Sequence, residues 1–373
     1  MKKSLALILI AALLAAPLAF AENIGDMTGL DINALTADNV ILLPDAFQGK
    51  SDEFCVSNAW YLLSAFNQQL GPQQKKLAES LGFDVIRQEY YGKELTDYSH
   101  TSAYTLATKE MNVRGEMRNV AIIGIRGSGD GEWYSNFDFA GESGEDCLYA
   151  ENFMAAAQTI FDHIKADLDA IERPVIIATG YSRGAATADL LGMLLDDAYG
   201  MEDIYVYNFA TPNTIRCEKE GYGNIFNIVN DNDCITHMPP ENWGFHRVGV
   251  DIVMKDETVT TPMVDTMFLS MRTICPSISS YYQDRHSLTG TGLSEDGITA
   301  LELLQGLSEL LINPTGLNLN AKKLIAMMTQ NKNDFTPFFT VFVPLVINYK
   351  APNGLLGQHL PEIYADLMNK IGK

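Results

Sequence analysis

The sequence predicts an α/β protein with a mostly parallel central sheet and helices on both faces. Short apolar runs, typical of buried strands, alternate with longer segments that repeat apolar residues at helical spacing. One such run, at residues 175–179, ends at a Gly-x-Ser-x-Gly motif that leads directly into an Ala-rich helical segment. In sheets of this kind, functional residues gather at the carboxyl ends of the strands.

The expected elements follow one another along the chain. The helices of the core are predicted over residues 52–70, 75–81, 153–171 and 185–195. The strands are predicted over residues 103–108, 120–125, 175–179, 204–210 and 225–229, with edge strands at 251–254 and 258–261. The helix over 153–171 has the clearest pattern, because its apolar residues share one face.

The first 21 residues predict a signal peptide. Lys2 and Lys3 precede an apolar stretch at residues 5–18, and Ala19-Phe20-Ala21 fits an A-x-A cleavage site. The stretch is short for a membrane span and lacks a flanking stop signal, although an uncleaved anchor is the alternative. We therefore expect export to the periplasm or the extracellular space, with no transmembrane segment in the mature form.

The acidic composition argues against nucleic acid as a partner, and the cysteine pattern argues against a structural zinc site. The chain has 26 basic and 47 acidic residues, a formal net charge of −21, so the phosphates of nucleic acids would be repelled. An exported chain can form disulfides, but spacing does not reveal their pairing and an odd count leaves at least one thiol unpaired. The five cysteines are Cys55, Cys147, Cys217, Cys234 and Cys275. No CxxC motif or Cys/His cluster indicates zinc, and we expect neither a metal nor an organic cofactor.

The pentapeptide Gly180-Tyr181-Ser182-Arg183-Gly184 predicts a nucleophile elbow. In this motif a sharp turn between strand and helix exposes the serine hydroxyl, and the flanking glycines prevent side-chain clashes. A serine that only caps the helix is the plainer alternative, but a cap does not require glycine on both sides. We therefore assign Ser182 as the candidate nucleophile.

A reactive serine needs a base, and the base needs a carboxylate that orients it. In α/β-hydrolases the chain order is Ser, then Asp or Glu, then His. Asp233 follows the strand predicted over 225–229 and is the candidate acid, with Asp231 as its rival at the same edge of the sheet; both could instead belong to a turn.

Four histidines follow the serine: His237, His246, His286 and His359. His237 lies too close in sequence to Asp233 to fold back on it easily. Of the others we favour His286, which lies in a polar loop, while His359 and His246 stay as alternatives. Any of them could instead have a surface or packing role.

An oxyanion hole needs two hydrogen-bond donors. One is the backbone N–H of the residue after the nucleophile, here Arg183. The second is expected from the loop after an earlier strand, and Ser128 follows the strand at 120–125, so it could offer both its N–H and its hydroxyl. A simple Gly-rich turn is the alternative for this loop.

These motifs, taken in order, resemble those of the class 3 lipases, the fungal triacylglycerol lipase-like branch of the α/β-hydrolases. The matching segments are residues 125–128, Trp133 and Asp138, residues 180–184, 209–213, 230–240 and 243–246. The resemblance covers roughly two thirds of the chain. It implies that Asp233 is the triad acid and that the catalytic histidine comes after His246, which favours His286. Around the serine the chain has Tyr181 and Arg183 where the family has His and Leu.

The resemblance also implies a domain organisation. Residues 22–290 would form the α/β-hydrolase domain, and residues 129–151, which hold aromatic side chains among glycines and acids, would be its lid. After about residue 294 helical patterns dominate, so residues 291–373 are expected to form a helical C-terminal extension or cap.

The expected activity is that of an exported serine carboxylic-ester hydrolase of the lipase or esterase type, acting through an acyl-enzyme. Its partner would be a small-molecule or lipid ester, with transient contact to a lipid interface. Two alternatives stay open: phospholipase A1-like or acyltransferase activity on the same scaffold, and a catalytically silent fold used for binding.

Overall fold

The computed structural model describes residues 38, 40, 42–67, 70–91, 101–128, 136, 147, 149–217, 219–239, 245–255 and 357–371. These residues include a seven-stranded sheet in which the strands lie side by side in chain order. The strands are β1 (Asp84–Glu89), β2 (Tyr104–Val113), β3 (Glu116–Ile125), β4 (Val175–Tyr181), β5 (Ile204–Phe209), β6 (Ile225–Asn230) and β7 (Val250–Met254). The first three strands pair antiparallel, and all pairs from β3 to β7 are parallel.

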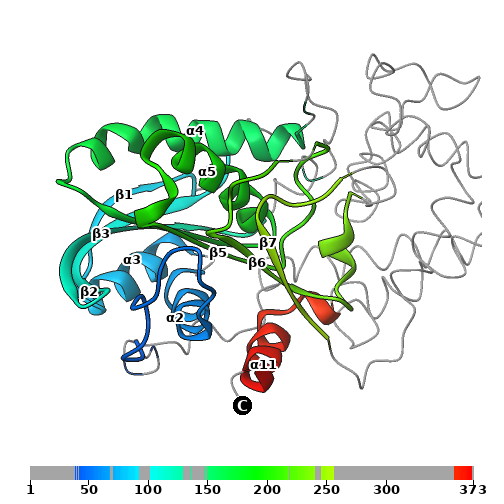
Figure 1. Cartoon of the computed structure of the whole chain (residues 1–373), viewed down its shortest axis with the longest axis horizontal. Coiled ribbons are helices and arrows are strands. Elements are labelled where there is room, and N and C mark those ends of the chain that lie inside the picture. Colours follow the sequence, from blue (N-terminus) through cyan, green and yellow to red (C-terminus); the bar gives the residue numbers. More distant parts are fainter. Residues whose placement is uncertain are drawn as a thin grey trace, which may run out of the picture.

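Helices cover both faces of this sheet, as Figure 1 shows. One face carries α4 (Glu151–Asp169) and α5 (Arg183–Tyr199), which connect the parallel strands β3, β4 and β5. The opposite face carries α2 (Val56–Phe66), α3 (Gly71–Ser80) and α11 (Pro361–Ile371). The predicted fold class, an α/β-hydrolase-type arrangement with a mostly parallel sheet, is confirmed.

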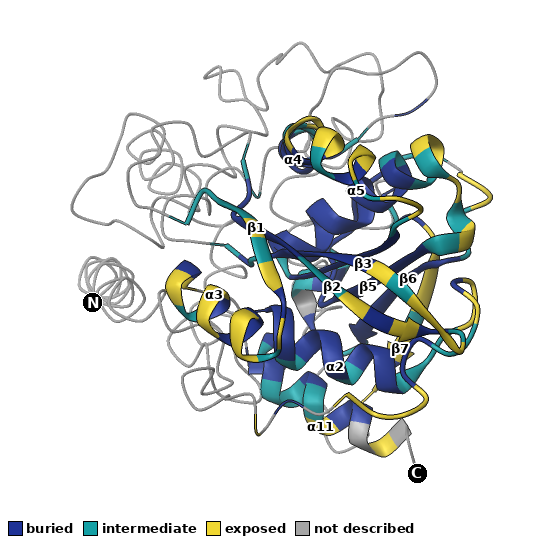
Figure 2. Ribbon diagram, turned by 90° about the vertical axis from the view of Figure 1, so that its left-hand side faces the viewer, coloured by how far each residue is buried: buried dark blue, intermediate teal, exposed yellow. Residues whose placement is uncertain are grey.

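Side chains along a strand point alternately to the two faces of the sheet, so the apolar core forms one layer on each face. Along β3, Ile123 and Ile125 pack with α4 and α5, whereas Val120 and Ile122 pack with the helices on the other face. Strands β4, β5 and β6 are therefore buried at every position and mostly apolar, as expected for strands covered on both faces. Figure 2 shows this burial along β4 to β6 and in the second half of β3, in contrast to the exposed residues on α3 and β7.

The structure extends the predicted elements at two places. The turn at Arg114-Gly115 joins β2 and β3 into a hairpin of two ten-residue strands, because the pairing continues from Tyr104–Ile125 to Val113–Glu116. Strand β1 was not predicted; its side chains alternate between exposed and half-buried, which gives a weak apolar signal.

The C-terminal helix does not stand apart from the core. In α11 the side chains of Tyr364, Leu367 and Met368 are buried in the same apolar cluster as α2 and the sheet. Most of the tail that we expected to be helical, up to residue 356, lies outside the described residues, as do the predicted signal peptide and the strand predicted at 258–261. None of the described helices is long and apolar enough to cross a membrane.

Candidate active site

Ser182 stands at the sharp turn between β4 and α5. Its backbone has φ 56° and ψ −121°, a conformation that L residues rarely adopt and that costs energy. A Cβ atom on Gly180 would overlap the backbone of Gly184, and one on Gly184 would overlap the carbonyl oxygen of Ile125. Glycine is thus required on both sides of the serine, as the elbow predicts, and the end of β3 touches the start of α5.

A histidine from the C-terminal tail lies against this serine. Nε2 of His359 lies 2.8 Å from Oγ of Ser182, and Nδ1 of the same ring lies 2.7 Å from Oδ2 of Asp233. Because the carboxylate can only accept, Nδ1 carries the hydrogen and Nε2 can accept the serine proton. The three side chains therefore form a continuous row of hydrogen bonds from Ser182 through His359 to Asp233.

This finding corrects the choice of histidine. The position that we assigned to His286 is occupied by His359, the alternative from the last helical segment, while His286 lies outside the described residues. Chain order alone allows either residue, since both follow Asp233. Of the other two candidates, His237 has its Nε2 3.2 Å from the backbone oxygen of Asp231, and His246 pairs with Ile215 through its backbone.

Asp233 is placed as the sequence predicted, just beyond the carboxyl end of β6. It is fully buried. Its Oδ1 accepts a hydrogen bond from the N–H of Ile235, in the short helical turn that follows Asp233. Its rival Asp231 is turned outward and pairs with Lys255 at 2.8 Å. Of the two carboxylates, only Asp233 can orient the histidine.

The tail is held at the site by further hydrogen bonds. The hydroxyl of Tyr181 donates to the backbone oxygen of His359 at 2.7 Å, and the amide of Asn230 donates to Gln358. Tyr364 donates its hydroxyl hydrogen to Oδ2 of Asp233 at 2.8 Å. Burial raises the pKa of both tyrosines well above the ordinary value, and the nearby charge of Asp233 raises it further, so both hydroxyls stay protonated donors.

The expected oxyanion loop lies beside the elbow. Ile125 pairs with Gly180 across the parallel strands, and Ser128 follows three residues later. Arg183 is the first residue of α5, where backbone N–H groups point out of the helix end. The side chain of Asn136 bridges the two candidate residues: it donates to Ser128 Oγ and accepts from Arg183 Nη1, both at 2.8 Å.

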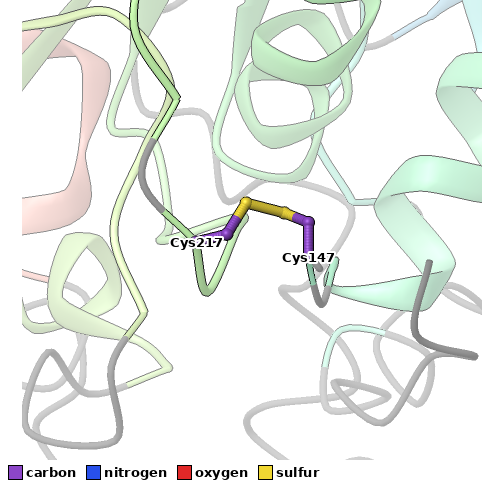
Figure 3. Close-up of a disulfide and its surroundings, with 2 residues drawn as sticks. All are labelled: Cys147 and Cys217. Carbon is purple, nitrogen blue, oxygen red and sulfur yellow. A yellow bond between two sulfur atoms is a disulfide. The ribbon is translucent and has the colours of Figure 1, made fainter. Parts of the chain in front are cut away.

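A disulfide joins the segment before α4 to the loop after β5. Cys147, just before α4, is bonded to Cys217 in the loop after β5 (Figure 3). Cys55 is a free thiol, and Cys275 lies outside the described residues. Most of the expected lid, with Trp133 and Asp138, also lies outside them. In the part of the chain that the structure describes, no cluster of three or more His, Cys, Asp or Glu side chains could hold a metal ion.

Comparison with known proteins agrees with the motifs. Residues 122–243 match the family described as Lipase (class 3), which confirms the predicted resemblance and supports a lipase-type hydrolase. No curated protein sequence gave a significant match.

The chain is also similar to solved lipase structures over about half of its length. One is a triacylglycerol lipase described as having a serine protease triad as its catalytic centre: identity is 17%, 53% of this chain and 79% of that chain are covered, and the TM-score is 0.41. Another is a lipase from Rhizopus microsporus var. chinensis, with 16% identity, 48% and 64% coverage and a TM-score of 0.38. The chain thus spans slightly less than two thirds of the length of the second protein.

Proposed function

We propose that this protein, which resembles the class 3 lipases, is an exported serine carboxylic-ester hydrolase of the lipase or esterase type. The observation that carries the proposal is the relay from Ser182 through His359 to Asp233, with contacts of 2.8 and 2.7 Å. Distances of this size allow proton transfer between serine and imidazole without prior rearrangement.

In the proposed reaction Ser182 attacks the ester carbonyl while His359 takes its proton at Nε2. His359 then gives the proton to the leaving alcohol, and an acyl-enzyme forms. Water, activated by the same imidazole, releases the acid. Asp233 holds the ring in the required tautomer and stabilises the imidazolium, and the tail residues keep that ring in place.

The developing oxyanion would be held by the N–H groups of Ser128 and Arg183. The contact between the end of β3 and the start of α5 supports this assignment, because it brings the two loops to one side of Ser182. The start of α5 adds the positive end of a helix dipole at the same place.

Export is proposed from two independent features. The N-terminal residues have the pattern of a signal peptide, and Cys147 and Cys217 form a disulfide. Disulfides persist mainly outside the cytoplasm, so the bond fits a periplasmic or extracellular protein. Fractionation of cells that express the full chain, followed by N-terminal sequencing of the mature form, would test this part; a cytoplasmic protein that keeps its first 21 residues would contradict it.

The test of catalysis compares Ser182→Ala, His359→Gln and His286→Gln in purified protein, with a panel of short-chain acyl esters. We expect the first two changes to lower kcat by about 10⁴-fold or more, and His286→Gln to leave it within about twofold. Full activity of Ser182→Ala would refute the proposal. Loss of activity in His286→Gln with normal activity in His359→Gln would instead identify His286 as the base.

A fluorophosphonate probe separates an enzyme from a silent fold. The probe forms a covalent adduct only with an activated serine, so an adduct on Ser182 of the wild type and none in His359→Gln is the expected result. An unlabelled wild-type protein would instead favour a binding role. Release rates from a phospholipid dispersion and from a soluble ester would then distinguish phospholipase A1-like activity from simple esterase activity.

A further inference from the structure

An arginine whose side chain is only 6% exposed lies beside the turn that carries Asp233. Asp233 caps the short helical turn η5 (Cys234–His237): its Oδ1 accepts the N–H of Ile235, and its backbone oxygen accepts the N–H and the hydroxyl of Thr236. At the far end of this turn, the backbone oxygen of Thr236 accepts a hydrogen bond from Nη1 of Arg247 at 2.5 Å. The guanidinium thus lies where a helical turn leaves its backbone oxygens without partners of its own.

Asp251 on β7 fixes the orientation of this arginine. Nε and Nη2 of Arg247 donate to the two carboxylate oxygens of Asp251, at 2.8 and 2.5 Å, so the planar guanidinium is held at two points. Strand β7 pairs in parallel with β6, and Asp233 follows the end of β6 by three residues. The arginine therefore has a fixed position relative to the strand that leads to Asp233, and its third nitrogen, Nη1, faces the turn.

The same nitrogen also contacts the loop after β5. Nη1 of Arg247 donates to the backbone oxygen of Thr211 at 3.2 Å and to Oδ1 of Asn213 at 3.0 Å. Because a guanidinium has only donors, the amide oxygen of Asn213 faces Arg247, and its Nδ2 donates to the backbone oxygen of Pro239 at 2.7 Å. The N–H of Asn213 donates to the backbone oxygen of Met238 at 2.8 Å. One guanidinium and one amide therefore hold η5 and the residues that follow it.

We propose that Arg247 is a positioning residue for ester hydrolysis, because by holding η5 it directs Oδ2 of Asp233 toward Nδ1 of His359. This inference rests on the proposed function. The contacts described above do not involve the serine or the imidazole, so Arg247 acts through Asp233. The carboxylate begins the turn that the guanidinium holds at its other end, so a rotation of the turn would move Oδ2 away from the imidazole. A contact of 2.7 Å tolerates little displacement.

The first variant is Arg247→Met in the full-length mature protein. It keeps an apolar stem and removes the guanidinium, so the buried backbone oxygen of Thr236 loses this donor and the turn is free to rotate. We expect kcat for a soluble short-chain ester to fall by about tenfold, with KM within about twofold, because the substrate does not contact Arg247.

A proton NMR signal reports on the same contact without substrate. The Nδ1 hydrogen of His359, which faces a carboxylate, should give a low-field signal, and its absence in His359→Gln would assign it. In Arg247→Met this signal should weaken or move upfield. A residue with a purely structural role would leave it unchanged in protein that is still folded.

Arg118→Met is the matched control. Nη2 of Arg118, near the start of β3, donates to Asp203 at 2.8 Å and to the backbone oxygen of Arg173 at 3.2 Å, and its side chain is also largely buried. The change removes a similar ion pair and a similar bond to a backbone oxygen. It should lower the free energy of unfolding, measured in urea, but leave kcat within about twofold and the low-field signal unchanged.

Arg247→Lys separates the geometry of the guanidinium from its charge. Lysine keeps a positive charge beside Asp251, which protects the fold if Arg247→Met is too unstable to study. A single ammonium lacks the planar fork, however, and cannot serve Asp251 and Thr236 at once. We expect a folded protein whose kcat is about three- to tenfold below that of the wild type, with the low-field signal changed in the same direction.

Each other result has a definite meaning. Wild-type kcat in either Arg247 variant would overturn this inference and leave the proposed function intact. Equal losses of kcat in Arg247→Met and Arg118→Met would also overturn it, since general destabilisation would then explain both. A wild type that does not cleave esters would overturn the proposed function, and the low-field signal in the Arg247 variants would then decide whether Arg247 positions Asp233.

Discussion

The hydroxyl of Tyr364 donates a hydrogen bond to Oδ2 of Asp233 at 2.8 Å, although the two residues are 131 positions apart in the chain. The same carboxylate oxygen faces Nδ1 of His359 at 2.7 Å. The tyrosine oxygen in turn accepts the backbone N–H of Asn230 at 3.1 Å. One residue of α11 thus connects Asp233, the proposed triad acid, to the end of β6 and lies five residues after His359, the proposed base.

We predict that Tyr364→Phe lowers kcat by about tenfold or less and the free energy of unfolding by about 1–3 kcal/mol, because Asp233 and the N–H of Asn230 both lose a buried partner. Activity assays and urea unfolding measure the two effects. Tyr205→Phe is the matched control: it removes a hydroxyl that bonds Gly49 on another part of the core, and it should cost stability alone. Equal kcat values for both variants and the wild type would contradict the role of Tyr364.

The second prediction concerns the elbow. Gly184→Ala would push a Cβ atom into the backbone oxygens of Ile125 and Arg126, which cannot move away as a flexible side chain can. We expect a loss of about 1–3 kcal/mol or more in unfolding free energy and a steep drop in kcat, since the turn at Ser182 must shift. Gly223→Ala, where the added methyl meets no atom within 4 Å, should leave both quantities almost unchanged. A fully active Gly184→Ala protein would contradict the close packing at this turn.

The third prediction concerns pH. Asp189 on α5 is fully buried, and burial raises its pKa to about 7, although it accepts hydrogen bonds from Thr214, Asn227 and Val248 and Arg247 lies nearby. Between about pH 4 and pH 7 the unfolded chain loses this proton while the folded protein keeps it. The folded state therefore loses stability as pH rises through this window, by at most about 4 kcal/mol.

Urea unfolding at a series of pH values compares wild type with Asp189→Asn. We expect the stability of the wild type relative to this variant to fall as pH rises from about 4 to about 7. Asp162→Asn removes a carboxylate at an exposed position of α4 and should show no such trend. A difference between wild type and Asp189→Asn that does not change with pH would show that Asp189 is ionised throughout.

The fourth prediction concerns the disulfide. Cys147 and Cys217 are separated by 70 residues, so the bond removes much of the freedom of the unfolded chain. The double change to serine should lower the unfolding free energy by about 2–4 kcal/mol under oxidising conditions. Wild type treated with a reductant should show a similar loss, whereas the double variant should not respond to the reductant. A wild type that is equally stable in both conditions would contradict this prediction.

Sequence patterns determined most of the fold and two of the three residues of the hydrogen-bonded set, Ser182 and Asp233. The apolar runs and their turns predict the buried parts of β2 to β7, because a strand covered on both faces is rich in apolar side chains. The glycines around Ser182 predict the elbow, since the backbone there leaves no room for a Cβ atom. The place after a core strand leaves both Asp231 and Asp233 as candidates, and the resemblance to the class 3 lipases favours Asp233. Each of these patterns involves residues that are close together in the sequence, so it can be recognised without knowing which distant residues they contact in the folded protein.

The partners of these residues were decided by tertiary structure. His359 was one of several downstream histidines, and nothing near it in the sequence distinguishes a base from a packing residue. It reaches Ser182 because α11 buries Tyr364, Leu367 and Met368 in the core beside α2, which brings the tail to the carboxyl edge of the sheet. The hydrogen bonds that join Arg183, Asn136 and Ser128 likewise could not be predicted from the sequence. Contacts between residues more than a hundred positions apart depend on how apolar faces pack, and that packing is a property of the whole fold.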